Sequence, residues 1–289
     1  MRIAIVGAGN VGRTLGRLCN VAGHEISDVV CQSKRSAKAA VKFIGAGRAW
    51  ESARVNLSPA DLVLVSTPDG RIRCAVELIE RNSSTLEQPV VLHTSGAIPS
   101  DELAALKAFG MSVGSCHPLQ TFESPNSALA IVASSYFCIE GEARAIRVAR
   151  RLVRGMGARY FEIPTEMKSL YHAAAVMSSG GIVALLSFSL DMLVRCGLAP
   201  SQARRVLLPL VEGTVANVSA VGPERALTGP VRRGDSGTVA RNLAALRAID
   251  SDAAELYRQL ARRSVALVEK RAATQDALLE VRRQLRKRR

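Results

Sequence analysis

The amino-terminal stretch of the chain limits its possible folds most strongly. Residues 2–6 form a short run of apolar and β-branched residues, long enough for one strand buried on both faces. Three glycines in the spacing G-x-G-x-x-G follow at residues 7–12. From Val11 apolar residues recur at helical spacing, and residues 26–31 are typical of a second strand. The order strand, glycine turn, helix, strand predicts a doubly wound, mostly parallel α/β sheet.

Each glycine of this motif has a physical role in holding a dinucleotide. Gly7 lets the chain turn tightly off the strand, Gly9 lets the backbone approach a pyrophosphate, and Gly12 lets the helix pack close to the sheet. The start of the helix offers unpaired N–H groups and a partial positive charge to the anion. We therefore predict a dinucleotide site whose turn comprises Gly7, Gly9, Asn10, Val11 and Gly12.

The end of the second strand indicates which dinucleotide is bound. An NAD enzyme usually carries an Asp or Glu about twenty residues past the motif, where it holds the ribose 2′-hydroxyl. Here the sequence is Cys31-Gln32-Ser33-Lys34-Arg35, without an acid. A hydroxyl and two cations suit a 2′-phosphate because charge-assisted hydrogen bonds to phosphate are strong. Ser33, Lys34 and Arg35 therefore predict NADP(H); the alternative is an ordinary solvated basic loop.

Length and composition narrow the class of protein further. The 289 residues suffice for two modest domains or one large one. Hydrophobic residues make up 48% of the chain and aromatic residues 4%, so the core must consist of Ala, Val, Leu and Ile. The six cysteines lie far apart, without a C-x-x-C pair or metal-ligand spacing. We expect no metal site, no signal peptide, and a reduced protein of the cytoplasm.

The net charge of +14 is concentrated near the carboxyl end. Residues 258–289 contain eleven Lys and Arg residues against three acids. A charge run of this kind is usually a solvated or frayed helix end. It could hold polyanions weakly through salt-dependent contacts, but we do not expect a nucleic-acid partner.

Strands and helices alternate up to residue 164. Strands are predicted at residues 61–66, 90–93, 111–115, 136–139 and 160–163, and helices at 36–45, 72–80 and 142–156, with another beginning at the cap residue Ser100. The loops containing Thr67 and Pro68, and Ser95 and Gly96, leave the carboxyl ends of strands, where open α/β sheets bind ligands. We predict that Thr67, Pro68 and Ser95 contact the cofactor. Ser95 and Gly96 are also predicted to contact the substrate.

The pattern changes at Pro164, where we place a domain boundary. Residues 1–164 would form the NADP-binding domain and residues 165–289 an all-helical substrate and dimerisation domain. One long helix is predicted over residues 165–196, with apolar residues all round it. Such a helix is buried on several sides, in a bundle or across a dimer interface. Serines and glycines interrupt its apolar stretch, so that it falls short of a membrane span.

Two positions on this helix are candidates for proton transfer. Lys168 and His172 are four residues apart and share one face. Lys suits an acid for a substrate oxygen or nitrogen, and His a second donor; the alternative is a surface Lys and a core His. His117, at a strand end before a proline, could contact the substrate or be an ordinary loop histidine. We expect His93 to shape the pocket and His24 to be structural.

Two further groups of residues could take part in catalysis or substrate binding. Cys116 beside His117 suggests a thiol nucleophile, but adjacent strand residues point to opposite faces, so the pair is poorly placed. The glycine-rich loop at residues 228–238 runs into a helix that Asp235 could cap, and its arginines could receive a carboxylate or phosphate. Arg233 and Asp235 are therefore predicted to contact the substrate; the alternative is an ordinary interhelical turn.

Six segments of the chain are informative together: IVGAGNVG, LVSTPD, HTSGAIPSDELAAL, GSCHPLQTF, KSLYHAAAVMSSGGIVALL and LTGPVRRGDSGTVARNL. With these segments the chain resembles the superfamily of 6-phosphogluconate dehydrogenase and pyrroline-5-carboxylate reductase. The chain is most similar to Rossmann-like proteins in it whose substrate is largely unassigned. The first two of the segments are widely shared, and the last four together are specific.

The resemblance implies an NADP-binding domain, a helical carboxyl-terminal domain, and a homodimer with its site between the domains. In the hydroxyacid dehydrogenase branch a catalytic Lys is followed four residues later by Asn, so Lys168 inherits the proton-donor role and His172 stands where Asn would. In the reductase branch a Gly-Ser-Gly-Pro kink and a Ser-Pro-Gly-Gly-Thr-Thr loop line the site. Residues 178–181 and 228–238 are similar but not identical to these, and keto and imine chemistry both stay open.

Sequence and resemblance together predict an NADPH-dependent oxidoreductase that reduces a small keto or imine compound in an interdomain cleft. Lys168, with His172 or His117, would supply the proton and orient the substrate. The cofactor carries out the difficult step and the protein positions it. The alternative is a non-catalytic sensor of NADP(H) that signals to a partner through its helical domain. No membrane association is expected.

Overall fold

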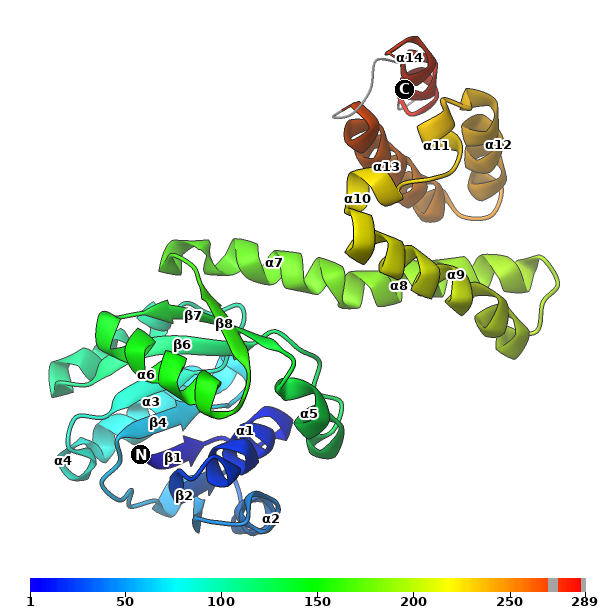
Figure 1. Cartoon of the computed structure of the whole chain (residues 1–289). Helices are drawn as coiled ribbons and strands as arrows, with labels where there is room; N and C mark the ends of the chain where they lie inside the picture. Colours follow the sequence, from blue (N-terminus) through cyan, green and yellow to red (C-terminus); the bar gives the residue numbers. More distant parts are fainter. Residues whose placement is uncertain (270–274, 287–289) are drawn as a thin grey trace. The chain divides into compact units, whose positions relative to one another are not determined.

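The computed structural model describes residues 1–269 and 275–286 (Figure 1). Its strands form one eight-stranded sheet in the order β3-β2-β1-β4-β5-β6-β7-β8. Neighbouring strands are parallel except β6 and β7, which are antiparallel. The strands are β1 (Arg2–Val6), β2 (Glu25–Cys31), β3 (Arg48–Glu51), β4 (Leu62–Val65), β5 (Val90–His93), β6 (Ser112–Pro118), β7 (Tyr136–Gly141) and β8 (Arg159–Glu162).

Helices cover both faces of this sheet. Ile3 and Ile5 of β1 belong to one apolar cluster, whereas Ala4 and Val6 belong to the other. Helices α1, α2, α5 and α6 contribute to the first cluster, and α3, α4 and η3 to the second. With both faces buried, a continuous apolar run specifies a strand better than alternation does. The bounds are α1 (Asn10–Val21), α2 (Lys34–Ile44), η1 (Ser52–Arg54), η2 (Asp69–Arg71), α3 (Ile72–Arg81), α4 (Ser83–Leu86), η3 (Ser100–Phe109), α5 (Pro125–Val132) and α6 (Ala143–Gly155).

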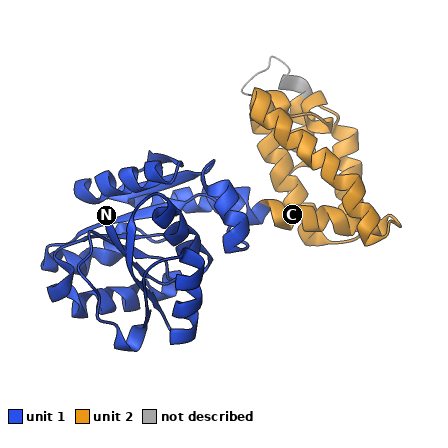
Figure 2. Ribbon diagram, turned by 60° about the horizontal axis from the view of Figure 1, so that its bottom comes forward, with its two compact units in different colours: residues 1–181 blue, residues 182–289 orange. Residues whose placement is uncertain are grey.

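The chain divides into two compact units, Met1–Gly181 and Ile182–Arg289 (Figure 2). The first holds the sheet, and the elements of the second are all helices among its described residues, so the predicted fold class is confirmed. The remaining elements are η4 (Thr165–Met167), α7 (Lys168–Ser178), α8 (Gly180–Arg195), α9 (Pro200–Val221), α10 (Pro223–Ala226), α11 (Pro230–Arg233), α12 (Ser236–Arg247), α13 (Ser251–Glu269) and α14 (Gln275–Gln284).

The compact first unit extends further along the chain than the predicted domain boundary at residue 164. The last strand, β8, ends at Glu162, close to that boundary. The unit nevertheless continues to Gly181, because the first turn of α7 packs its Lys168 and Tyr171 side chains against the sheet. The sequence marks where the strands stop, whereas these side-chain contacts extend the compact unit.

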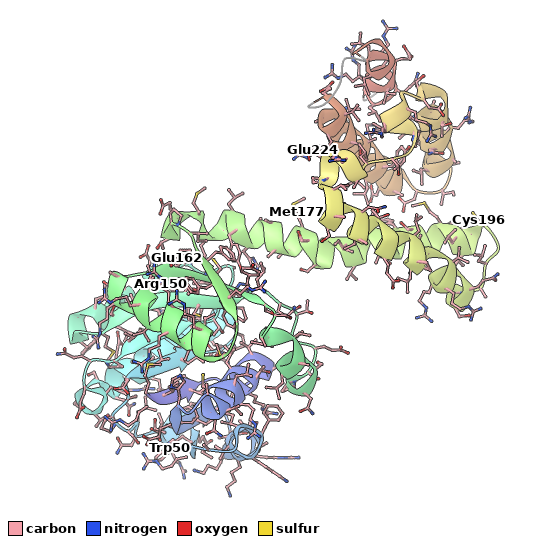
Figure 3. All side chains as sticks on the ribbon, viewed as in Figure 1. Trp50, Arg150, Glu162, Met177, Cys196 and Glu224 are labelled. Carbon is pink, nitrogen blue, oxygen red and sulfur yellow. The ribbon has the colours of Figure 1, made fainter. Side chains whose placement is uncertain are left out.

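The predicted long helix is interrupted, and it is not buried. Ser179 (φ −119°, ψ −82°) separates α7 from α8. Lys168 is the buried residue of α7, and α8 has none. The expectation that this stretch falls short of a membrane span is also wrong: by length and composition alone, residues 165–195 could cross a membrane, and an 18-residue window in them has a mean hydropathy of 1.8. The expectation of burial on several sides is therefore wrong for the single chain, and the exposed apolar side chains include Met177 (Figure 3).

Two elements of the structure were not predicted from the sequence, and one predicted helix cap is absent from the described residues. Strand β3 (RAWE) was missed because it is short, polar and only partly buried. Helix α5, capped by Ser124, was also missed. Ser100 does not cap η3, since Pro99 stands at that position and the Ser100 hydroxyl donates instead to Glu140.

The described parts of the basic carboxyl-terminal segment, residues 258–269 and 275–286, are folded into the second unit. In α14 and just after it, Leu278, Val281 and Leu285 are buried. Arg262 of α13 donates two hydrogen bonds to the Leu285 carbonyl. Where it is described, the charge run carries exposed arginines such as Arg282 and Arg283 near the end of α14, and its residues 270–274 and 287–289 lie outside the described residues.

We predict that Asp28→Ala destabilises the first unit strongly. Asp28 is fully buried and accepts hydrogen bonds from Trp50 Nε1 (2.7 Å), the Ser58 amide (2.9 Å) and Arg48 Nε (3.2 Å). Its removal leaves these donors unpaired, at a cost of about 3 kcal/mol. Urea unfolding followed by the fluorescence of Trp50, the single tryptophan, measures the loss. Exposed Asp101 provides the control, and equal stability of Asp28→Ala and Asp101→Ala would contradict this account.

Candidate functional site

The glycine turn has the backbone contacts that its spacing predicts. Gly7 has a φ of +88°, and a Cβ there would lie 2.7 Å from the Thr67 amide nitrogen. A Cβ on residue 12 would lie 2.3 Å from the Gly7 carbonyl oxygen. A Cβ on Gly9 would meet no atom of the described residues within 4 Å. The turn is therefore closed toward the sheet and open on the side where a ligand can approach.

Helix α1 begins at this open side with its first turn available to an anion. Gly9 is the N-cap, no side chain caps the helix, and its first turn contains no acid. The Asn10 amide group donates to the carbonyls of Phe122 and Glu123, both at 3.0 Å. These bonds fix the start of α1 against the loop after β6. A helix start held in this way presents backbone N–H groups and positive dipole charge to a phosphate.

A cavity of about 970 Å³ extends from this turn across the carboxyl ends of the parallel strands. Its volume is near the upper end of the range of about 300–1,000 Å³ for ligand sites. Ser66 and Thr67 are among the residues that line it, and their hydroxyl oxygens are buried without a hydrogen-bond partner among the described residues. An extended ligand rich in hydroxyl and phosphate oxygens, such as a dinucleotide, fits this lining. Seven of the eleven predicted cofactor residues line the cavity, Gly12 shapes the turn beneath it, and the other three do neither. The seven are Gly7, Gly9, Asn10, Val11, Thr67, Pro68 and Ser95.

The three exceptions are the residues predicted to hold the 2′-phosphate. Ser33 caps α2, accepting a hydrogen bond from the Ser36 amide. Lys34 donates to the Ala49 carbonyl, and its ammonium lies 5.3 Å from the centroid of the Trp50 ring. Arg35 is exposed and does not line the cavity. Because β3 was missed in the sequence, Trp50 could not be foreseen as the partner of Lys34.

Different residues border the cavity at this end. Gln32, Ser36 and Ser52 do so, and Glu51 pairs with Cys31 in the register of β2 and β3. No sequence pattern pointed to Glu51 or Ser52, since Glu51 ends the unpredicted strand β3 and Ser52 follows it. The role of Ser33, Lys34 and Arg35 toward a 2′-phosphate stays a prediction.

The far end of the cavity is lined by two histidines. His117 of β6 and His172 of α7 face each other edge to face, with ring centroids 6.3 Å apart and planes at 77°. Ser95 and Gly96 line the same end. A Cβ on Gly96 would lie 2.7 Å from His117 Nε2 and 2.6 Å from His172 Cδ2, so only glycine leaves both rings in place.

Lys168 is buried beneath this end and does not line the cavity. Its ammonium donates to Ser115 Oγ at 2.5 Å and pairs with Glu140 Oε1 at 3.7 Å. Ser115 Oγ in turn donates to the Ser95 carbonyl at 3.4 Å. Glu140 also accepts bonds from Ser100 and Thr165. A buried charge is tolerated only with such partners, so the pair is part of the foundation of the site.

This buried charge affects the neighbouring histidines. Burial, followed by the nearby Lys168 charge and then by His172, lowers the pKa of His117 to about 4. Burial and Lys168 together lower the pKa of His93 to about 3. Both imidazoles are therefore neutral at physiological pH. The pKa of Lys168 is lowered by burial and raised by Glu140.

Tyr171 is a site residue that the sequence did not single out. Its hydroxyl lies 2.7 Å from His117 Nδ1 and is also hydrogen-bonded to the Cys138 thiol. Its position on the same helix as Lys168 and His172 is the sequence feature that could have indicated a place in the site. Cys116, by contrast, is buried, and burial raises the pKa of its thiol to about 12, in line with its rejection as a nucleophile.

Two predicted substrate residues lie in the second unit. Asp235 caps α12 by accepting a hydrogen bond from the Thr238 amide at 2.9 Å, as the loop pattern suggested, and this bond lowers its pKa. Arg233 ends α11 and is exposed. Their contact with a substrate stays a prediction.

Two family models match successive parts of the chain. Residues 1–118 match the Rossmann-like domain, and residues 135–264 match a domain of unknown function, DUF2520. No curated protein matches the sequence of the chain.

Solved structures share this architecture along nearly the whole chain. TM1727 from Thermotoga maritima is 25% identical, over 93% of this chain and 98% of its own, with a TM-score of 0.75. BF3122 from Bacteroides fragilis, provisionally named an NADP oxidoreductase, is 25% identical over 92% and 98%, with a TM-score of 0.71. Pyrroline carboxylate reductase from Plasmodium falciparum, with NADP bound, is 12% identical over 93% and 98%, with a TM-score of 0.58, and shows the fold alone. The resemblance inferred from the sequence is confirmed, and the substrate stays unassigned.

We predict that Lys168→Met and Glu140→Gln each destabilise the first unit by about 3–5 kcal/mol, because each leaves a buried charge without its partner. The double variant should lose less than the sum of the two, since the pair is removed together. Chemical denaturation measures all three. Glu162→Gln, which breaks the exposed Arg150–Glu162 pair (Figure 3), is the control and should cost much less. Additive losses at Lys168 and Glu140 would show that the two charges are not coupled.

Proposed function

We propose that this protein is an NADPH-dependent oxidoreductase that reduces a small keto or imine compound. The observation that carries the proposal is the single cavity that begins at the glycine turn and ends at His117 and His172. A dinucleotide with its pyrophosphate at the start of α1 would direct its nicotinamide toward the carboxyl ends of β5 and β6. BF3122, similar over most of both chains, carries an oxidoreductase name, which supports the same class.

The chain's own residues would bind the cofactor and complete the reaction. When bound, NADPH supplies a hydride. The α1 amide groups bind its pyrophosphate, close to the lining residues Ser66 and Thr67. His117 and His172 are the groups within reach of a substrate oxygen or nitrogen. Lys168, buried below Ser115, acts on the site through its charge.

The preference for NADP(H) over NAD(H) is supported by the absence of an acid at residues 31–36. An NAD site would place a carboxylate there to hold the ribose 2′-hydroxyl. The exposed Arg35 and the start of α2 offer positive charge to a 2′-phosphate instead. The Glu51 carboxylate, at the end of β3, would repel a 2′-phosphate. The preference between NADPH and NADH can therefore be measured directly.

We predict that NADPH protects Cys74 from alkylation. Cys74 is exposed and lines the cavity, whereas Cys196, at the end of α8 (Figure 3), is exposed elsewhere and serves as an internal control. Saturating NADPH should slow iodoacetamide modification of Cys74 by on the order of tenfold, as expected for a ligand that covers its pocket, and leave Cys196 unchanged. Mass spectrometry of the labelled peptides gives both rates.

NADH should require a higher concentration for the same protection. Equal protection by the two cofactors would refute the NADP(H) preference, and no protection by either would refute the cofactor site. Protection without oxidation of NADPH by any carbonyl or imine substrate would favour the alternative function, a non-catalytic sensor.

We further propose that the helical unit forms a homodimer. Helices α8 and α9 expose a series of apolar side chains: Ile182, Val183, Leu185, Val194, Val206, Leu208, Leu210, Val215, Val218 and Val221. Large exposed apolar surfaces usually mark an interface. A second copy is favoured over a membrane because the stretch 165–195 is held at its start by the contacts of Lys168 and Tyr171 with the sheet.

The expected outcome is a dimer in sedimentation velocity that Leu210→Lys or Val215→Lys converts to a monomer. Their side chains are 68% and 55% exposed, so the substitutions leave the fold of the subunit intact. Val21→Lys, at a 70% exposed position of the first unit, should remain dimeric. A monomeric parent protein, or one that sediments with vesicles, would refute the dimer.

A further inference from the structure

Titratable side chains from several elements surround the histidine end of the cavity. His117 is approached by Lys168, Tyr171 and His172 from α7, and by His93 from β5, with Cys116 beside it and Cys138 on β7. The carboxylate of this end is Glu140. Its two oxygens are taken up by Ser100, Thr165 and Lys168, and it is fully buried.

Lys168 and Glu140 form a buried ion pair, and Lys168 is the member of the pair that acts on the histidine rings. It lowers the pKa of both His117 and His93, and Glu140 is not among the groups that affect either ring. The path from the ammonium to the cavity wall is short: Lys168 donates to Ser115, which donates to the carbonyl of the lining residue Ser95. Asp69, the carboxylate among the described lining residues, follows β4, two strands away from β6.

The hydrogen bonds around His117 also fix where its proton lies. The Tyr171 hydroxyl can donate to an imidazole nitrogen or to the Cys138 sulfur, and the nitrogen is much the better acceptor. The distance allows either group to be the donor, and we infer from acceptor strength that Tyr171 donates to Nδ1. In a neutral ring the remaining proton is then on Nε2, the nitrogen that faces Gly96 in the cavity.

These features discriminate between the two substrate classes. A carbonyl gains negative charge on oxygen as hydride adds to its carbon, whereas an imine is reduced as its positively charged, protonated form. A neutral N–H donor above a buried ammonium stabilises the first and repels the second. A site for an iminium would place a carboxylate beside it.

We propose that the substrate of this site is a ketone or aldehyde, that His117 donates its Nε2 proton to the substrate oxygen, and that Tyr171 and Lys168 are positioning residues. The inference rests on the proposed function. Hydride from the reduced nicotinamide forms the new C–H bond, and the C=O π electron pair moves to oxygen. That oxygen takes the His117 proton, Tyr171 passes its own proton to Nδ1, and a solvent proton restores the hydroxyl.

The charge and tautomer of His117 can be tested without any substrate. The chain has four histidines, so NMR of the ¹³C- and ¹⁵N-histidine-labelled protein is simple, and His117→Gln assigns the signal. We expect a neutral His117 with Nε2–H from pH 5.5 upward. Lys168→Met should raise its pKa from about 4 toward 6.5 and leave that of His24 unchanged, since His24 responds to the amino terminus and Arg151.

Tyr171→Phe provides the second variant in case Lys168→Met does not fold. It removes one hydroxyl, and should shift part of the His117 population to the Nδ1–H tautomer. An imidazolium at pH 7 in the parent protein, or an unchanged tautomer in Tyr171→Phe, would overturn the proposed arrangement.

Turnover with NADPH tests the substrate class. Ketones and 2-oxo acids should be reduced with kcat/KM values at least about 100-fold above those of cyclic imines of similar size. His117→Gln should lower kcat by about 100-fold, and Tyr171→Phe should lower kcat with little change in KM and alter the pH profile. Faster reduction of imines would overturn the proposal.

The failure of the proposed function has a different signature. If NADPH binds and neither class is turned over, the oxidoreductase assignment fails and the carbonyl assignment falls with it. The NMR titration still decides in that case whether Lys168 and Tyr171 hold His117 neutral with its proton toward the cavity.

Discussion

The buried ammonium of Lys168 is the constraint on which the arrangement of the site depends. A charge with 1% of its side chain exposed must be matched, and Ser115 of β6 and Glu140 of β7 supply the match. These contacts bring the first turn of α7 onto the sheet, which in turn sets Tyr171 against His117 and brings His172 to the cavity wall. One buried pair thus joins strand ends and helix into a single site.

Much of the sheet could be predicted because its central strands have both faces buried. β1, β4 and β5 are continuous apolar runs between turn residues, and few other structures accommodate such runs. β3 lies at the edge of the sheet with only partly buried residues, so its sequence RAWE carries no comparable signal. The omission had a consequence for the site, because Trp50 of this strand is the ring over which the Lys34 ammonium lies.

The candidate site was predictable where it depends on strand ends, and not where it depends on side-chain direction. Ser95 and Gly96 after β5, and His117 at the end of β6, come together because parallel neighbours end at one edge of the sheet. The spacing of Lys168 and His172 correctly indicated a shared helix face. It could not show that one side chain enters the protein and the other borders the cavity, since this depends on Glu140 and Ser115, which are distant in sequence.

A Lys beside a nicotinamide can act either as a proton donor or as a fixed charge. A Lys that gives up its proton must reach the substrate, and its charge is lost in the step. Lys168 has Ser115 and Glu140 as partners and is sealed from the cavity, so it does not reach a substrate there. A positive charge below a neutral imidazole favours the build-up of negative charge above it. Burial thus turns a residue type usually associated with proton transfer into an electrostatic element, which is why we propose His117 as the donor.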